Sequence, residues 1–411
     1  MITIAREQLG SDVARALIGA LNEELAAAYP EPGATHFSLA LDDVEPGRGA
    51  FLVARDDGVP VGCGAIRSID ARTCEIKRMY VAASMRGSGL GRRIVEALED
   101  EAAALGATRV VLETGIRQQP AIALYRAMGY EPIPLYGEYV HSPATSLCFG
   151  KSLGADIERF IADGYLVVRN AFARDVADAC ARDIAAVLRT QGVDVDDRTT
   201  WTKPVVRIDC PFGEPWAAAG TSPALARMYD RLLGRDRWTK RKGVGGTIPV
   251  RFPVDGDPGD AGWHIDGSYD VDGQWWTNVH SRVRGLLALF LFSDVGEHDA
   301  PTEIIVGSHL DVPHLLAPHG ERGVYFAEVS EKLPPSTFAR PRAFATGRAG
   351  DVYICHPFLV HRATWPHRGT IPRMMAQPEI GHEEPFALRG DGAMCAVERA
   401  IMSGLVEPHA R

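Results

Sequence analysis

The chain lacks several features that would restrict its class. Its seven cysteines are scattered, odd in number and free of any C-x-x-C pair, which argues against a disulfide framework and for a reducing compartment. No stretch of about 18 apolar residues is present that could cross a bilayer. The N-terminus has no basic patch followed by an apolar core, so we expect no signal peptide. Together these absences predict a cytoplasmic protein without a membrane segment.

An excess of positive charge is also missing. The formal net charge is −9, so we expect neither a nucleic-acid partner nor binding to an anionic membrane. The basic run 240–242 is typical of a solvated loop. Small-molecule substrates are the expected partners, and a homo-oligomer stays open. The 411 residues, 46% hydrophobic and 24% charged, indicate an ordinary globular chain with more than one domain.

Residues 1–153 read as alternating strands and helices. Asp57-Gly58 between two apolar runs indicates a β-hairpin. Helix 92–105 carries its apolar residues on one face, and Gly106 supplies its C-terminal stop. The other expected elements are strands 75–81, 110–114 and 146–149 and a helix over 120–127.

Residues 154–411 form a second region with a different pattern. Helices are expected at 157–162 and 175–188, around a short strand at 165–168. The rest is rich in strands, Trp, Gly and Pro. The continuous apolar run 285–292 fits a strand that is buried on both faces better than a helix.

The most informative motif of the second region is His264-Ile265-Asp266, with His361 at the end of the apolar run 351–361. Two imidazoles and one carboxylate are a ligand set suited to non-haem Fe(II). Residues i and i+2 of an extended strand point to one face, so His264 and Asp266 can bind one metal together. Because Asp266 is a carboxylate rather than Ala or Gly, oxygen insertion is favoured over halogenation. His356 is an alternative distal ligand.

Gly262–Tyr269 and His356–His361 resemble the phytanoyl-CoA dioxygenase family. The resemblance implies a double-stranded β-helix (a jelly-roll, cupin-like domain) with flanking helices over 154–411. It also implies an Fe(II)- and 2-oxoglutarate-dependent dioxygenase that uses O2 to hydroxylate a small molecule. In the same family an arginine grips the far carboxylate of 2-oxoglutarate, and Arg373 stands at that place.

Two further positions bear on the cosubstrate. The family often has Ser or Thr two places after the arginine, but Met375 stands here. Thr302 or Thr247 is therefore a candidate for the second contact. Trp263, Trp275 and Trp276 flank the motif, and one of them is a candidate for the pocket wall, with packing as the alternative. A non-catalytic jelly-roll binder is the competing interpretation, against which the complete triad with Arg373 argues.

The first region carries a glycine-rich turn, Arg86-Gly87-Ser88-Gly89-Leu90-Gly91, between a strand and a helix. Backbone N–H groups at a helix N-terminus bind anions, and glycines let a phosphate approach closely. A dinucleotide-binding fold is the first competitor, but the R-x-x-G-x-G spacing fits its G-x-G-x-x-G pattern poorly.

This turn, with strand 75–81 and the segment 121–130, resembles the acetyl-CoA site of GNAT-type N-acetyltransferases. The resemblance covers 1–153 and implies an α/β fold with a mixed sheet flanked by helices. Tyr125 matches the tyrosine that protonates the leaving thiolate, and Glu75 and Glu113 are the candidate general bases. Gln118 replaces the usual Asn of the pantetheine contact. The residues expected to bind acetyl-CoA are Met79, Val81, Arg86, Gly87, Ser88, Gly89, Leu90 and Gly91.

The sequence therefore predicts a bifunctional enzyme, an acetyltransferase of amines followed by an oxygenase. Their covalent fusion suggests that both act in one small-molecule pathway. The alternative is an active oxygenase whose first region only binds acyl-CoA, regulates or supports an oligomer.

Overall fold

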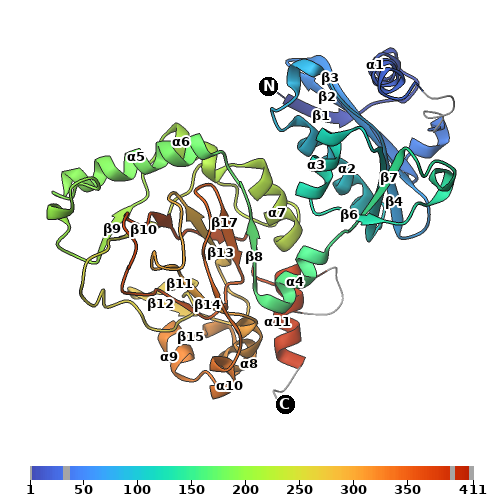
Figure 1. Cartoon of the computed structure of the whole chain (residues 1–411). Helices are drawn as coiled ribbons and strands as arrows, with labels where there is room; N and C mark the ends of the chain where they lie inside the picture. Colours follow the sequence, from blue (N-terminus) through green and yellow to red (C-terminus); the bar gives the residue numbers. More distant parts are fainter. Residues whose placement is uncertain (1, 31–37, 389–393, 407–411) are drawn as a thin grey trace. The chain divides into compact units, whose positions relative to one another are not determined.

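A computed structural model describes residues 2–30, 38–388 and 394–406 of the chain. It divides into two compact units, Met1–Ala155 and Asp156–Arg411 (Figure 1). The division falls two residues after the boundary expected from the sequence. No helix in the described part of the chain is both long enough and apolar enough to pass through a membrane.

The first unit is an α/β fold around a seven-stranded mixed sheet with the order β1-β2-β3-β4-β5-β7-β6. Its strands are β1 Ile2–Arg6, β2 Gly49–Asp56, β3 Val59–Ser68, β4 Thr73–Val81, β5 Arg109–Gly115, β6 Glu131–Ile133 and β7 Ser146–Ser152. Its helices are α1 Asp12–Ala28, α2 Leu90–Ala104 and α3 Gln119–Ala127, with short 3-10 turns that include η3 Gly137–His141.

The sheet of the first unit buries both faces because its side chains alternate. On β2, Leu52 and Ala54 join the core under α2 and α3, while Phe51 and Val53 join the core under α1. Figure 1 shows these helices on the two faces of the sheet. The hairpin expected at Asp57-Gly58 is confirmed, since both residues have positive φ in the β2–β3 turn.

The central strands β4 and β5 separate part-way along their length. They pair in parallel only over Thr73–Ile76 and Arg109–Leu112. Beyond that point β4 carries a bulge against β3, where Arg78 adopts a φ of 56°. Residues 77–81 and 113–115 are therefore not paired with each other.

The second unit is built mainly from antiparallel strands. They are β8 Tyr165–Val168, β9 Val205–Asp209, β10 Thr247–Arg251, β11 Tyr269–Val271, β12 Gln274–Thr277, β13 Arg284–Leu291, β14 Glu303–Ile305, β15 Val324–Tyr325, β16 Arg342–Phe344, β17 Val352–Cys355, β18 His361–Arg362, β19 Met375–Ala376 and β20 Glu379–Gly381. The helices are α4 Ala155–Asp163, α5 Arg174–Thr190, α6 Glu214–Gly220, α7 Pro223–Leu233, α8 Pro313–Leu316, α9 Phe326–Glu331, α10 Pro335–Phe338 and α11 Ala396–Val406.

The expected buried strand, β13, lies at the centre of the second unit, beside β17 (Figure 1). It belongs to the sheet β19-β13-β17-β8, which β20 extends, and a second sheet has the order β16-β14-β18. One face of β13, with Leu287 and Leu289, packs with Ile304 of β14. The other face, with Phe290, packs in the large core that includes Ile184 of α5. Both faces of β13 are thus covered, as its apolar run predicts.

The apolar run 351–361 spans two strands, because β17 ends at Cys355 in one sheet and His361 begins β18 in another. The extended strand expected to carry His264 and Asp266 needs correction, because His264 makes only an isolated antiparallel bridge, to His361, and Asp266 lies outside any strand. The loop stays close to β12 because Gly267 has no side chain: an added Cβ would lie 2.5 Å from the Cβ of Trp275.

Candidate active sites

His264, Asp266 and His361 converge although they come from distant segments. One ligand atom from each lies within 4.8 Å of the others. The backbone brings the histidines together: His264 N donates to His361 O at 3.0 Å, and His361 N donates to His264 O at 2.9 Å. The imidazole centroids are 4.5 Å apart. The three ligands expected from the sequence are therefore close enough to bind one metal ion.

Both imidazoles are oriented for metal binding. Nδ1 of His264 lies 2.8 Å from Gly262 O, and Nδ1 of His361 lies 3.0 Å from Leu359 O. Because a carbonyl oxygen only accepts, each Nδ1 carries the proton and each Nε2 keeps its lone pair. A carbonyl partner of this kind fixes the tautomer of a metal-bound histidine. The residues thus fit a divalent metal by donor type and by tautomer.

The charges around the triad favour its ligand forms. Burial lowers the pKa of His361 to about 4, so its ring is neutral at physiological pH. Burial opposes ionisation of Asp266, but Arg284, whose Nη1 lies 3.4 Å from Oδ2, acts together with His361 and His264 to lower the pKa of that carboxyl. Asp266 is therefore a carboxylate beside a neutral His361 ring, and the triad offers nitrogen and oxygen donors to a metal.

The triad faces a cavity of about 280 Å³. Its wall is mostly polar and comes from β9, β10, β13, β18 and neighbouring loops. The lining residues are Arg207, Thr247, Pro249, Arg251, Asp260, His264, Asp266, Arg284, Leu287, Thr302, His361, Ala363 and Gln377.

The expected cosubstrate residues have different positions. Thr302 and Thr247 both line the cavity, and Oγ1 of Thr302 is buried without a hydrogen-bond partner among the described residues. Met375 is buried in the core between the sheets. Arg373 is buried next to the cavity but is not one of its lining residues.

Arg373 is held by the protein's own backbone. Its Nη1 donates to Ala300 O at 2.6 Å, and its Nη2 lies 3.3 Å from Pro249 O. Its Nε has no partner in the described part of the chain. Burial, together with neighbouring Arg251, lowers the pKa of Arg373 well below its usual range. The guanidinium is thus an unneutralised buried cation, which favours an anion beside it.

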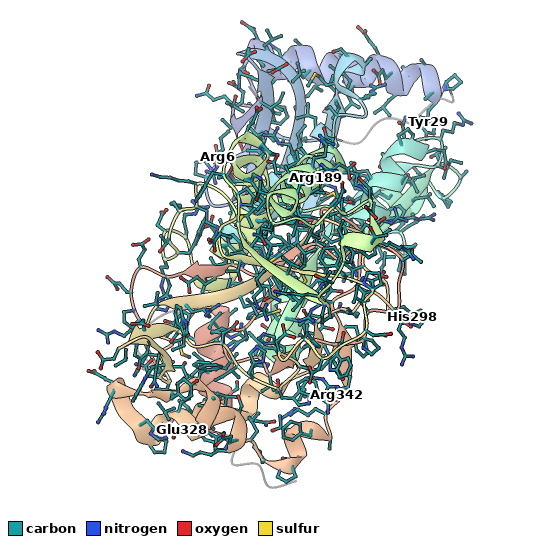
Figure 2. All side chains as sticks on the ribbon, turned by 90° about the vertical axis from the view of Figure 1, so that its left-hand side faces the viewer. Arg6, Tyr29, Arg189, His298, Glu328 and Arg342 are labelled. Atoms are coloured by element: carbon teal, nitrogen blue, oxygen red, sulfur yellow. The ribbon has the colours of Figure 1, made fainter. Side chains whose placement is uncertain are left out.

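The structure places the three tryptophans and His356 relative to the cavity and the triad. The described residues that line the cavity include none of Trp263, Trp275 and Trp276. Two guanidinium groups lie over the ring of Trp263, those of Arg342 and Arg362 at 4.5 and 4.4 Å from its centroid; Figure 2 labels Arg342. His356 lies away from the triad, packed 4.7 Å from the ring of His309.

In the first unit, the glycine-rich turn leads directly into α2. Gly87 and Gly89 have φ values of 81° and 82°, and a Cβ at either position would meet no atom within 4 Å. No side chain caps the first turn of α2 at Gly89. Its backbone N–H groups are therefore open to an anion, as a phosphate loop requires. Arg86 is turned aside by Glu24, at 2.7 Å, and by Val81 O, at 3.0 Å.

The two candidate bases differ sharply. Glu75 is buried, and its carboxylate accepts hydrogen bonds from Arg67, Tyr136 and Tyr139 at 2.7 to 2.9 Å. Lys77 lies 3.9 Å away. With these donors around it, the Glu75 carboxylate is held in a structural network, and its expected role as a base is not supported.

Glu113 lies on β5, one residue beyond the last pair with β4. Burial raises its pKa to about 7, although the nearby Ser146 hydroxyl and Lys77 ammonium act in the opposite direction. A carboxylate that titrates near neutral pH is suited to general base catalysis. Burial, with Glu113 as a neighbouring charge, raises the pKa of Tyr125 on α3, so that phenol keeps its proton.

Sequence reasoning missed the charged wall of the oxygenase-type cavity. Arg207, Arg251 and Arg284 line it together with Asp260. A signal was available for two of them, because Arg251 ends the apolar strand β10 and Arg284 opens the apolar strand β13.

A mixed α/β unit with a phosphate-type loop and a strand-rich unit with a facial ligand triad define a chain of two enzyme parts. Comparison with protein families identifies both parts. The acetyltransferase (GNAT) family matches residues 18–130, and the phytanoyl-CoA dioxygenase (PhyH) family matches residues 160–375, about half of the chain. The chain belongs to the phytanoyl-CoA dioxygenase family and carries a GNAT acetyltransferase domain in front of that region.

Several known proteins are similar to the first unit. An IAA acetyltransferase of Azospirillum brasilense is 41% identical over 144 residues, 34% of this chain and 92% of that protein. An uncharacterised N-acetyltransferase of Bacillus subtilis (strain 168) is 31% identical over 130 residues, 30% of this chain and 86% of that protein. A solved IAA acetyltransferase from Bacillus cereus ATCC 14579 is 19% identical, covers 37% of this chain and 100% of its own, and has a TM-score of 0.29.

Proposed function

We propose that the second unit is an Fe(II)- and 2-oxoglutarate-dependent oxygenase that hydroxylates a small molecule. The convergence of His264, Asp266 and His361, with both Nδ1 atoms tied to carbonyls, carries this proposal. Bound Fe(II) would supply the activation of O2. The overall reaction joins one oxygen atom of O2 to the substrate C–H bond, and the other enters succinate as 2-oxoglutarate loses CO2.

The chain's own residues bind and orient the reactants. We assign the far carboxylate of 2-oxoglutarate to Arg373, whose buried Nε lacks a partner in the described structure, with Thr302 as the second contact. A planar guanidinium binds a carboxylate through two hydrogen bonds. Arg373 does not line the cavity, so Pro249 or Ala300 must move slightly when the cosubstrate binds for the guanidinium to reach it.

We also propose that the two packed sheets form a double-stranded β-helix, supported by the shared core between β13 and β14.

The oxygenase is tested by anaerobic titration of the full chain with Fe(II) and 2-oxoglutarate, followed by a screen of small molecules for succinate release. We expect both ligands to bind and at least one compound to raise succinate formation. Failure to bind Fe(II) would exclude the proposal.

We propose that the first unit transfers an acetyl group from acetyl-CoA to an amine. The turn from Arg86 to Gly91 would hold the CoA pyrophosphate, and Met79 and Val81 on the diverging edge of β4 would hold the pantetheine arm. Glu113 takes a proton from the amine, the nitrogen attacks the thioester carbon, and the carbon–sulfur bond breaks. Tyr125 then protonates the leaving thiolate.

The seven cysteines, all free thiols, support a cytoplasmic location.

Acetyl-CoA consumption over a panel of amines, with IAA included because the Azospirillum brasilense relative is named for it, tests the acetyltransferase. We expect acetyl-CoA to bind and one acceptor to be acetylated. Tight binding without turnover on any acceptor would favour the alternative role, a module that senses acetyl-CoA or supports an oligomer.

A further inference from the structure

The cavity at the triad has an unusual wall for a small-molecule site. Such pockets are mostly apolar with a few polar groups, whereas only Pro249, Leu287 and Ala363 give this one an apolar surface. Alternate residues of β10 line it, ending at Arg251, and Arg207 of β9 pairs opposite Pro249. The wall therefore suits a charged ligand rather than a fatty one.

Two of the arginines already hold a carboxylate. Nη2 of Arg251 donates to both oxygens of Asp260 at 2.7 Å, and Arg207 donates to the same carboxylate. Arg251 is almost fully buried, while the side chain of Arg207 is 50% exposed. Asp260 lies in the loop between β10 and His264. The carboxylate that Arg207 and Arg251 bind therefore belongs to a loop, whereas the two arginines belong to strands.

The charges around the cavity are not balanced by that carboxylate alone. Arg251 and Arg207 lie close enough to Arg373 to oppose its positive charge, and Asp260 is the nearby acid that favours it. The Nε atoms of Arg251 and Arg373 are both buried and without a partner in the described residues. Arg284 adds a further positive charge at the triad. Besides Asp266 it pairs with Glu379, whose side chain is 41% exposed, so water screens this second ion pair.

A divalent metal and the dianion 2-oxoglutarate cancel each other in charge. The arginines around the cavity then still outnumber Asp260 and Asp266 after the site is loaded. Burying unpaired guanidinium groups is costly, and an oxyanion removes that cost by accepting their hydrogen bonds.

We infer that the oxygenase unit takes a small anionic substrate, whose carboxylate or phosphoryl group binds Arg207 and Arg251 in the place that Asp260 fills. The inference rests on the proposed oxygenase activity and specifies its substrate class. Asp260 acts as an internal competitor, released when the substrate oxyanion enters. The negative group anchors one end of the substrate, and the C–H bond to be hydroxylated lies toward His264 and His361.

The test uses the full chain loaded anaerobically with Mn(II) and 2-oxoglutarate, and isothermal titration with methylphosphonate, acetate and methylammonium. We expect at least one of the two oxyanions to bind, and methylammonium not to bind. The tighter oxyanion identifies the group. Arg207→Gln should weaken its binding about tenfold or more, since hydrogen bonds to charged groups contribute at that level. Arg207→Lys should retain part of the affinity, and Asp260→Asn should raise it.

Arg189→Gln is the matched control. The Arg189 side chain is 51% exposed and also pairs with two carboxylates, those of Asp194 and Asp196, on the same unit (Figure 2). It should leave oxyanion affinity unchanged. If Mn(II) fails to bind the unmodified chain, the proposed oxygenase fails and this inference fails with it. If Mn(II) and 2-oxoglutarate bind but neither oxyanion does, or if Arg207→Gln and Arg189→Gln behave alike, the substrate class alone is overturned.

Discussion

The two units build their candidate sites in opposite ways. In the second unit three side chains from segments far apart in sequence meet at one point, fixed by a backbone bridge between His264 and His361. In the first unit six consecutive residues, 86–91, present backbone N–H groups at the start of one helix. The first arrangement depends on side-chain identity, and the second depends on backbone conformation.

The units also treat buried charge differently. In the first unit the carboxylate of Glu75 is surrounded by donors, while its neighbour Glu113 has a pKa raised by burial to about 7. At the cavity of the second unit the charge excess is positive, and Arg251 and Arg373 keep buried Nε atoms without partners among the described residues. We expect the candidate site of the first unit to transfer protons and that of the second unit to bind anions.

The largest effect is expected from the triad. His264→Ala removes one of the three proposed metal ligands, so Mn(II) affinity should fall more than about 100-fold and succinate formation should stop, given that even outer residues of metal sites contribute about 10- to 100-fold. Anaerobic titration measures the first and succinate release the second. His298→Ala, at an exposed histidine labelled in Figure 2, is the control. Unchanged Mn(II) affinity in His264→Ala would contradict the assignment.

The next effect separates the two glutamates. With Glu113 as the base, the acetylation rate of the unmodified chain should rise as pH increases through about 7, because the carboxylate form is the active one. Glu113→Gln should lower the rate about 100-fold or more and remove this rise. Glu75→Gln should keep the rise. A profile in which Glu75→Gln alone loses it would reverse the two roles.

A smaller effect tests the backbone nature of the CoA loop. Gly89→Ala places a Cβ at a φ of 82°, which costs about 1–2 kcal/mol in the left-handed region. Because the strain distorts the N–H groups of the loop, acetyl-CoA affinity measured by calorimetry should fall about tenfold. Gly47→Ala is matched to it, with a φ of 86° and open space around the position. Equal losses in both variants would mean that the loop has no special role.

The smallest effect concerns support of the triad. Trp263→Leu removes two cation–π contacts, from Arg342 and Arg362, each contributing about 0.5–1 kcal/mol. Because Trp263 adjoins His264, Mn(II) affinity should fall about twofold to tenfold. Trp275→Leu, at a residue that is 48% exposed, should leave it unchanged. A Trp263→Leu chain that binds Mn(II) like the unmodified one would limit this tryptophan to packing.

Local patterns in the sequence predicted much of the fold. The hairpin at Asp57-Gly58, the helix ending before Gly106 and the buried strand β13 all appear as expected. Each depends on short-range physics: a turn needs residues that tolerate positive φ, and periodicity marks the buried face. The helix α1 and the pair β9–β10 were not predicted.

Other features depend on long-range packing. Asp266 was expected on an extended strand with His264, yet it lies outside any strand. Within the apolar run 351–361, Cys355 pairs in one sheet and His361 in another. Trp263, one of three tryptophans considered for the pocket wall, has its ring covered by two arginines. Neither a sheet change nor a cation–π contact between distant residues leaves a local pattern in the chain.

The sequence by itself determined the chemistry available: the ligand types His264, Asp266 and His361, the glycines of the loop, and the order of the two units. These depend on residue identity and near spacing. Only the tertiary structure distinguished the two carboxylates, because burial raises the pKa of Glu113 whereas hydrogen-bond donors surround Glu75. It also gathered Arg207, Arg251 and Arg284 around one cavity, since electrostatic interactions depend on distance in space rather than along the chain.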